Sequence, residues 1–172
     1  QQHCVKQLDI LRNAADQSKY NLTETTSILD YLAKLTSQWK ALRPEMVLND
    51  EFSGIENFEV SMDQTISHAI LNLLNNAADA SLSNGINSIS MTSEIIKNAF
   101  YIHIDDHGPG LSKNFKEKTD GAVFSSKPKG FGIGLLLSHS SLSRYDGSVK
   151  LQQTEDGVRS TICIPLYKIR TT

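Results

Sequence analysis

This sequence has only two cysteines, no long apolar run and no large excess of charge of one sign. The two cysteines, Cys4 and Cys163, lie far apart and outside any C-x-x-C pair, which excludes a disulfide framework and the standard zinc motifs and is typical of a reducing compartment. No apolar run reaches about 18 residues, so no membrane span is predicted, and no signal peptide is visible. The net charge of −2 gives no argument for binding nucleic acid or a membrane surface.

The composition that remains is that of a soluble globular protein. The chain has 172 residues, of which 39% are hydrophobic and 21% charged, enough for one domain and part of a second. It begins without an initiator methionine, in a sequence typical of the middle of a helix. We therefore expect it to be part of a longer protein.

Apolar periodicity predicts helices, and alternation predicts strands. Helices are expected at about 3–18, 23–41 and 63–82, and after a glycine turn at 130–134. Asp63 is expected to cap the third helix, and Arg43-Pro44 to end the second. Strands are expected at 45–50, 57–61, 86–93, 99–106, 147–154 and 158–165. This order predicts an α/β sandwich, with a mixed sheet covered by helices on one face.

The third predicted helix carries "HAILNLLNNAADAS", an apolar run in which His68, Asn72 and Asn76 recur every four residues along one edge. A buried amide without a hydrogen bond costs about 1–3 kcal/mol. The stripe therefore indicates a polar cleft beside the core, and amide oxygens suit Mg²⁺ that keeps some of its waters. The alternative is that these are capping or structural amides, with His68 merely on the helix face.

A second motif, "DDHGPG", follows the strand predicted at 99–106. Gly108 and Gly110 allow positive φ and a close approach of the backbone to a flat ligand. Asp106, just before them, can accept a hydrogen bond from an exocyclic amine. The alternative is an ordinary turn in which Asp106 bonds to its own backbone.

A third motif, "SSKPKGFGIGLLL", combines hydroxyls, a lysine and three glycines ahead of a helix. Backbone N–H groups at such a turn converge on an anion, and the helix start adds partial positive charge. The motif is not a Walker A loop, and it falls too late for a dinucleotide fingerprint. Alone it also fits a flexible turn, but the three motifs together predict a nucleotide site. Its residues here are Ser125, Ser126, Lys127, Gly130, Gly132 and Gly134.

In this order and spacing, "NLLNNAADAS", "DDHGPGLS" and "GFGIGL" resemble the N, G1 and G2 boxes of the histidine-kinase ATP-binding domain. That domain belongs to the superfamily shared with gyrase and the mismatch-repair ATPase MutL. The resemblance covers about residues 45–167 and implies a two-layer Bergerat-type α/β sandwich. It places the ATP-binding domain at 21–172, an ATP lid at about 112–129, and part of a helical dimerisation hairpin at 1–20.

The resemblance also implies a role for each motif. Asn76 would bind Mg²⁺, Asn72 would support the phosphates, and Asp106 would bind the adenine amino group in a pocket shaped by Gly108 and Gly110. The serines and the lysine would approach the terminal phosphates, and the three later glycines would wrap the triphosphate. Asp79 and Leu135 complete the expected ATP-binding set.

Asn72 bears on the mechanism, and His107 and Ser160 depart from the family pattern. Hydrolysing members carry a general-base glutamate where this chain has Asn72. A neutral amide takes no proton from water, so we expect slow hydrolysis and a γ-phosphate kept for an acceptor. His107 stands where asparagine is common and receives no role. Ser160 stands where an aromatic residue is usual, at the back of the adenine pocket.

The likeness implies a sensor kinase whose phosphate passes to a histidine and then to the receiver domain of a response regulator. His3 lacks the neighbouring acid and proline of an acceptor, so the acceptor is expected upstream. The whole protein is expected to be a homodimer anchored in the bacterial inner membrane, with this part in the cytoplasm. "QQHCVKQLDIL" and "SQWKALRPEMVL" further resemble the Reg/Prr redox-responsive kinases. Cys4 would then be a redox switch, or else a plain thiol.

Three other functions remain open. "HIDDH", with His103, Asp105, Asp106 and His107, could belong to a metal-dependent phosphohydrolase, although strand alternation points His103 and Asp105 away from the apolar face. The domain could instead bind nucleotide without chemistry, or could phosphorylate a protein serine. Cys163, inside a predicted strand, is expected in the core.

Overall fold

The structure is a computed structural model that describes residues 25–52, 55–111 and 141–171. Its centre is a five-stranded sheet in the order β2-β4-β5-β7-β6. Only the β2–β4 pair is parallel, so the sheet is mixed, as predicted. The strands are β2 (Val47–Glu51), β4 (Ser88–Ile96), β5 (Ala99–Asp105), β6 (Ser148–Gln153) and β7 (Val158–Pro165).

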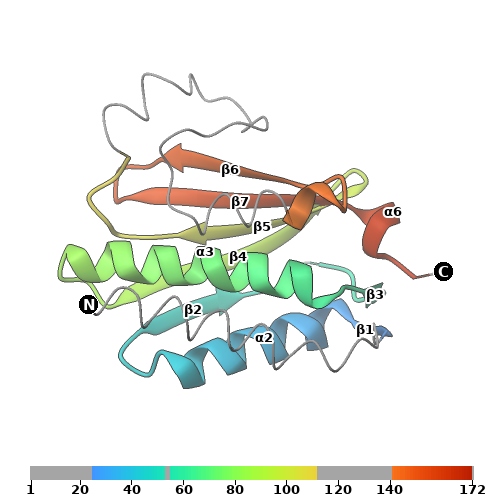
Figure 1. Ribbon diagram of the computed structural model, residues 1–172, viewed down its shortest axis with the longest axis horizontal. Helices are drawn as coiled ribbons and strands as arrows, with labels where there is room; N and C mark the ends of the chain where they lie inside the picture. The colour runs from blue at the N-terminus through green and yellow to red at the C-terminus, as the bar shows by residue number, and fades with distance from the viewer. Residues whose placement is uncertain (1–24, 53–54, 112–140, 172) are drawn as a thin grey trace.

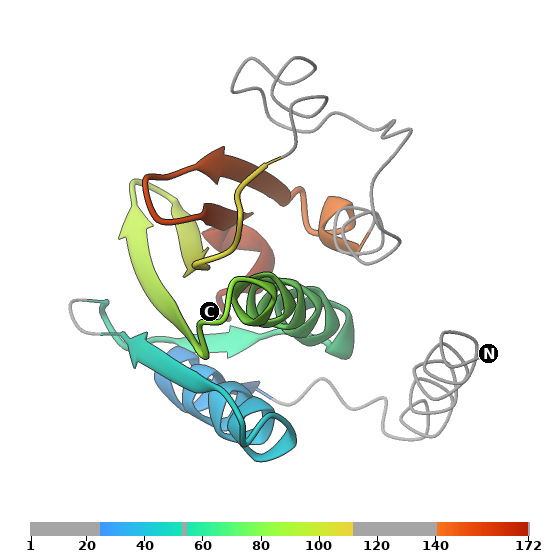
Figure 2. The same cartoon turned by 90° about the vertical axis from the view of Figure 1, so that its left-hand side faces the viewer.

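Helices cover one face of this sheet, which confirms the predicted two-layer α/β architecture (Figures 1 and 2). Helix α3 (Gln64–Ser83) packs against β4, β5 and β7, and α2 (Ile28–Leu42) packs beside β2. The core lies between the layers, where the apolar side of α3 meets the inward residues of the sheet. A short α6 (Leu166–Ile169) follows β7. None of the helices in the described ranges combines the length and apolar character needed to cross a membrane.

The start of α2 differs from the prediction. A helix was expected from about residue 23, but Thr25–Ser27 forms β1, which pairs antiparallel with β3 (Glu59–Ser61). The helix begins only at Ile28, because the Ser27 hydroxyl accepts a hydrogen bond from the backbone N–H of Asp30 at 3.1 Å and so caps it. The two β-branched threonines favour the extended conformation ahead of that cap.

Helix α3 begins and ends as its sequence predicts. The Asp63 side chain accepts a hydrogen bond from the backbone N–H of Thr65 at 2.8 Å and caps the first turn. At the other end Asn84 is the C-cap, and Gly85 takes a φ of +76°, a conformation that suits glycine just past a helix. The motif residues of α3 therefore lie on one uninterrupted helix.

Strand β5 alternates as predicted, with Phe100, Ile102 and Ile104 buried. The expectation that Cys163 lies in the core is wrong. It pairs with Tyr101 across β7 and β5 and is only half-buried, as a free thiol. The register places Cys163 on the same face as Tyr101, opposite the helices, because neighbouring residues of a strand point to opposite faces.

Candidate functional site

A small pocket of about 150 Å³ lies where α3 meets the ends of β6 and β7 and the turn after β5. Its polar lining comes from three residues far apart in sequence, Asn76, Asp106 and Ser160. Apolar side chains form the rest of the wall, namely Leu73, Ala77, Leu111, Leu151 and Val158. The structure thus brings together one residue of the asparagine stripe and the aspartate of "DDHGPG". An apolar pocket with a few convergent polar groups is typical of a small-molecule site.

Asp106 is held rigidly at this pocket and is only 7% exposed. Its Oδ1 accepts hydrogen bonds from the backbone N–H groups of Gly108 (2.9 Å) and Val158 (3.0 Å). Its own N–H donates to the carbonyl of Val158 at 3.0 Å. No hydrogen bond reaches Oδ2 from any residue that the structure describes. The bond to Gly108 is the local turn considered above, so Asp106 forms the turn and also offers a second oxygen to a ligand.

Burial raises the pKa of the Asp106 carboxyl above its usual range, while the two backbone N–H donors act in the opposite direction. The raised pKa means that desolvation of the charged form outweighs those two bonds. A ligand that donates a hydrogen bond to Oδ2 would offset part of this cost. An exocyclic amine is such a donor.

Close packing explains both glycines of the turn. A Cβ on Gly108 would lie 2.7 Å from the Cβ of Ala80 on α3. Gly110 has a φ of +87°, and a Cβ there would lie 2.6 Å from Nε2 of Gln153. The turn is therefore pressed between α3 and the β6–β7 hairpin, and only glycine fits at these two points.

Other anchors of the turn were not identified from the sequence. The buried hydroxyl of Ser81 accepts a hydrogen bond from the backbone N–H of His107 at 2.9 Å, and the side-chain amide of Asn84 donates to the His107 carbonyl at 3.0 Å. His107 thus helps to anchor the turn through its backbone N–H and carbonyl groups. Ser81 and Asn84 close the "NLLNNAADAS" helix, but no local pattern says that they reach 23 to 26 residues ahead.

Gln153 and Gly157 anchor the pocket from the hairpin side, and the sequence also gave no sign of their role. Gln153 accepts a hydrogen bond from the Leu111 backbone N–H at 2.8 Å and donates to the Gly157 carbonyl at 2.9 Å. A Cβ on Gly157 would lie against the carbonyl oxygen of Asp106 and 2.5 Å from its Oδ1. Gly157 lies in the short connection between the strands predicted at 147–154 and 158–165, but its contact with Asp106 depends on tertiary packing.

The asparagines of α3 divide between two sides of the helix. Asn76 is exposed at the pocket, and Asn72, one turn earlier, is half-buried. Asn75 instead faces α2, where its Oδ1 accepts a hydrogen bond from the indole N–H of Trp39 at 3.0 Å. Asp79 follows one turn after Asn75 and forms an ion pair with Arg43 at 3.0 Å. The structure therefore places Asp79 in a contact with Arg43, the residue that caps the C-terminal end of α2, outside the lining of the 150 Å³ pocket.

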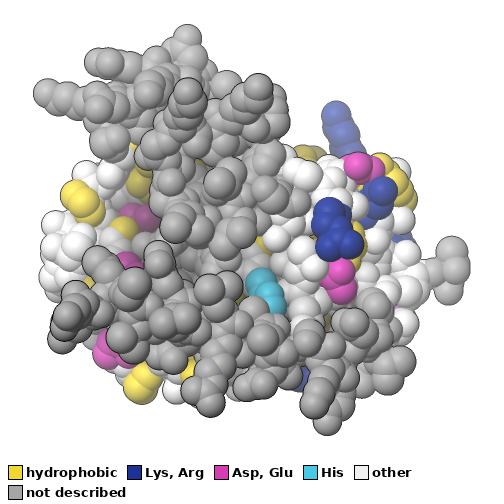
Figure 3. Space-filling view, viewed as in Figure 1, with side chains coloured by type: hydrophobic (Ala, Val, Ile, Leu, Met, Phe, Trp, Pro, Cys, Tyr) yellow, Lys and Arg dark blue, Asp and Glu magenta, His cyan; other side chains and the backbone are white. Residues whose placement is uncertain are grey.

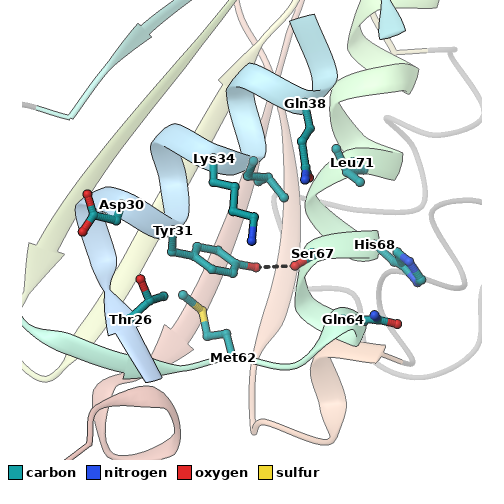
Figure 4. A pocket seen from close by; sticks show the side chains of 11 residues that line it. Thr26, Asp30, Tyr31, Lys34, Gln38, Met62, Gln64, Ser67, His68 and Leu71 are labelled. Carbon is teal, nitrogen blue, oxygen red and sulfur yellow. Dashed lines mark hydrogen bonds between the residues drawn. The ribbon is translucent and has the colours of Figure 1, made fainter. Parts of the chain in front are cut away.

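A second, larger pocket of about 560 Å³ lies between α2 and α3, and His68 lies at its edge. Figure 4 shows Tyr31 and Lys34 of α2 facing Ser67 of α3 across it. The hydroxyls of Tyr31 and Ser67 are 2.7 Å apart, and burial raises the pKa of Tyr31. His68 and Asn76 thus line two different pockets.

The side chains of "HIDDH" do not converge on a metal. His103 bonds to Glu94 (2.8 Å) and to Thr161 (3.0 Å) on the sheet face away from the helices. Asp105 forms a two-pronged ion pair with Arg159, at 2.7 and 2.9 Å. Within the described ranges, no group of three or more histidine, cysteine or acidic side chains is arranged to hold a metal ion.

On the face seen in Figure 3, the described basic side chains form no continuous patch.

Several predicted residues lie outside the described part of the chain. They are Ser125, Ser126, Lys127, Gly130, Gly132, Gly134 and Leu135, together with the lid at 112–129, Cys4, His3 and the segment 1–20. The roles expected for them stay predictions.

The chain matches known proteins over most of its length. Residues 62–168 match the family described as histidine kinase-, DNA gyrase B-, and HSP90-like ATPase. The C4-dicarboxylate transport sensor protein DctB of Rhizobium meliloti is 26% identical over 103 residues, which are 60% of this chain and 16% of that protein. The sensory histidine kinase/phosphatase NtrB of Escherichia coli is 21% identical over an alignment of 179 positions, which covers 95% of this chain and 51% of that protein. The chain thus spans about half of NtrB, and much less of DctB.

Solved structures show the same fold. The catalytic domain of histidine kinase ThkA superposes with a TM-score of 0.64 and 24% identity, covering 84% of this chain and 99% of that one. Histidine kinase ThkA in complex with response regulator protein TrrA gives a TM-score of 0.65 and 21% identity, covering 97% of this chain and 49% of that one. The matched family spans well over half of the sequence, and its ATP-binding fold is the one described above. The chain therefore belongs to the family of histidine kinase-, DNA gyrase B-, and HSP90-like ATPases.

Proposed function

We propose that this chain is the ATP-binding catalytic domain of a sensor histidine kinase, which transfers the γ-phosphate of ATP to a histidine outside the chain. The observation that carries the proposal is the buried carboxylate of Asp106, with one oxygen fixed by two backbone N–H groups and the other left to a ligand. The adenine amino group would donate to that second oxygen. The apolar walls of the pocket would exclude water from the flat faces of the base.

Asn76 lies at the mouth of the same pocket and is exposed, so its amide oxygen can serve as a hard neutral ligand for Mg²⁺. Bound there, Mg²⁺ would neutralise charge on the triphosphate. Asn72, one helical turn earlier, would support the phosphates. Its side chain is an amide and accepts no proton from water, so it cannot act as a general base for hydrolysis. The phosphate would be kept for a protein acceptor.

We extend the proposal to the whole protein. Residues 21–172 would form the ATP-binding domain, with a lid at about 112–129 that brings its serines, lysine and glycines to the phosphates. Residues 1–20 would end the dimerisation hairpin of a homodimer, with Cys4 as a redox switch. The phosphate would then pass to the receiver domain of a response regulator, in line with the structure of ThkA in complex with TrrA. Such a protein would be anchored in a bacterial inner membrane, with this domain in the cytoplasm.

The first test is calorimetric titration of the chain with a non-hydrolysable ATP analogue, with and without Mg²⁺. The native chain should bind more tightly with Mg²⁺. Asn76→Asp should alter affinity mainly when Mg²⁺ is present, because the change adds a charge at the metal position and leaves the base pocket intact. An unchanged affinity of Asn76→Asp under both conditions would remove Asn76 from the site.

The second test labels the whole protein with γ-phosphate-labelled ATP. A phosphohistidine is lost in acid and survives alkali, whereas a phosphoserine survives acid. Label that is lost in acid supports the histidine kinase. Acid-stable label would assign the domain to protein serine kinases, and nucleotide binding without any label would make it a binding module.

A further inference from the structure

The pocket of about 560 Å³ between α2 and α3 plays no part in the proposed function. Its volume lies within the range of about 300–1,000 Å³ that is typical of small-molecule sites. Ser67 on α3 lines this pocket, whereas Asn76, about half a rotation away around the helix, lines the nucleotide pocket. Helix α3 therefore separates two sites that can be occupied at the same time.

Four side chains that can donate hydrogen bonds face the larger pocket (Figure 4). They are Tyr31, Lys34 and Gln38 of α2 and Ser67 of α3. Asp30 is the one acidic residue among those that line the pocket. Figure 4 shows its carboxylate directed away from the donors, and it accepts a hydrogen bond from the Ser27 hydroxyl at 2.8 Å. The polar part of the pocket thus has an excess of donors.

Lys34 supplies the positive charge of this part of the pocket. Asp30 lies one helical turn earlier, a spacing at which opposite charges often pair, but its carboxylate is engaged by Ser27. Lys34 forms no ion pair or hydrogen bond with any residue that the structure describes. Its ammonium group is therefore available to an anion in the pocket.

The hydroxyls of Tyr31 and Ser67 supply one further donor. They are 2.7 Å apart, so one donates to the other. Two hydroxyls carry two protons and this bond uses one of them, so the second remains available to a ligand. Burial raises the pKa of Tyr31, which keeps both protons in place at neutral pH.

Apolar side chains form the rest of the lining. Leu35 and Met62 are buried at the pocket, and Leu71 is partly buried beside Ser67. A ligand that satisfied the donors alone would leave this surface in contact with water. A hydrocarbon chain would cover it, and that burial is favourable.

We propose that the pocket between α2 and α3 binds a small amphipathic monocarboxylate, a carboxylic acid with a short hydrocarbon chain. Its carboxylate would accept hydrogen bonds from Lys34, from Gln38 and from the remaining hydroxyl proton of the Tyr31–Ser67 pair. Its chain would lie on the three apolar side chains. One lysine matches one negative charge, which favours a carboxylate over a doubly charged phosphate. The proposal does not depend on ATP binding at Asp106.

The test compares three probes that separate the charge from the chain. The chain is labelled with ¹⁵N and titrated with sodium hexanoate, sodium acetate or 1-hexanol at constant pH and ionic strength, and amide chemical shifts are followed. Hexanoate should shift amides at 30–38 and 64–71 and leave those of Asp106 and Gly108 unchanged. 1-Hexanol should bind about 2- to 5-fold more weakly, the effect of one partly exposed ion pair. Acetate, which lacks the chain, should bind more weakly than hexanoate.

Two substitutions on one helix make the comparison specific. Lys34→Gln removes the charge at an exposed position and should bind hexanoate and 1-hexanol equally. Lys40→Gln is the matched control, because Lys40 lies on the same helix but pairs with Asp50 outside the pocket, at 2.6 Å. It should keep the native preference for hexanoate.

The proposal would be overturned by the same preference for hexanoate in Lys34→Gln and in the native chain, because the charge would then act elsewhere. Shifts centred on Asp106, or displacement of hexanoate by a non-hydrolysable ATP analogue, would also overturn it, since they would place the probe in the nucleotide pocket. A titration with hexanoate that does not saturate would do so as well. None of these results bears on the affinity for ATP, which is measured separately.

Discussion

Replacing Asp106 by asparagine changes one oxygen of the pocket and nearly nothing else. Asparagine has the same shape, and its carbonyl can keep the Oδ1 position, where the N–H groups of Gly108 and Val158 donate. A flipped amide would turn its NH₂ toward those two donors, so the backbone fixes the orientation. The NH₂ group then replaces Oδ2 and faces the ligand. An acceptor becomes a donor at the one atom that is proposed to bind adenine.

The expected effect follows from the kind of bond that is lost. A hydrogen bond to a charged group contributes about 1.5–3 kcal/mol. At about 1.4 kcal/mol for each tenfold step, Asp106→Asn should weaken ATP about 10- to 140-fold. The loss should be the same with and without Mg²⁺, because Asp106 reads the base and not the phosphates.

The same substitution should not lower the free energy of unfolding at pH 7, although it weakens ATP binding. Burial raises the pKa of Asp106 in the folded protein, so its contribution to stability is fully present below the unfolded-state pKa and is lost as pH rises through the folded-state pKa. A neutral amide does not titrate. Asp106→Asn should therefore be at least as stable as the native chain at pH 7, and its advantage should vanish below about pH 3.9, the ordinary aspartate pKa.

Two measurements check these expectations on the same samples. Calorimetric titration with a non-hydrolysable ATP analogue gives the affinity, and urea unfolding at several pH values gives the free energy of unfolding. Weak binding by a variant that is fully stable would locate the loss in the pocket. An unchanged affinity would refute the assignment of Asp106, and a large loss of stability at pH 7 would refute the assumed geometry.

Four further substitutions test binding and folding. Asn75→Ala leaves the buried indole N–H of Trp39 without its partner and should cost about 1–3 kcal/mol in urea unfolding without changing the affinity for ATP. Asn76→Ala should do the reverse, with weaker Mg²⁺-dependent binding and unchanged unfolding. Gly157→Ala places a Cβ against the turn of the pocket and should cost about 1–3 kcal/mol and also weaken ATP binding in calorimetry. Ser93→Ala removes a buried, unpaired hydroxyl and should raise the free energy of unfolding by about 1 kcal/mol.

Local sequence signals predicted those parts of the fold that depend on local contacts. The cap at Asp63 and the alternation of β5 were correct because each depends on residues a few positions apart. The order of helices and strands was enough for the layered architecture and the mixed sheet. The position of Asp106 at a pocket followed from a strand that ends in a glycine turn.

The errors and omissions all concern long-range contacts. Thr25–Ser27 forms a strand because it pairs with Glu59–Ser61, more than 30 residues away. Cys163 lies on the outer face because of its register against Tyr101, and an apolar strand sequence does not say which face is covered. Gln153 and Gly157 hold the turn of Asp106 from a separate hairpin. Glutamine and glycine are common in surface turns, so the sequence around Gln153 and Gly157 did not indicate their role.

The neighbours Asn75 and Asn76 show how one motif can contain two kinds of residue. Successive residues of a helix are about 100° apart, so the side chains of adjacent asparagines point in different directions. Asn75 bonds to Trp39 and joins α3 to α2, whereas Asn76 is exposed at the pocket. Residues four positions apart lie on the same side of the helix. Asn72 and Asn76 therefore form one set, and Asn75 and Asp79 form the other. Loss of ATP binding on mutating this motif is therefore informative only where unfolding is measured on the same variant, because Asn75 and Asp79 hold the helix that presents Asn72 and Asn76.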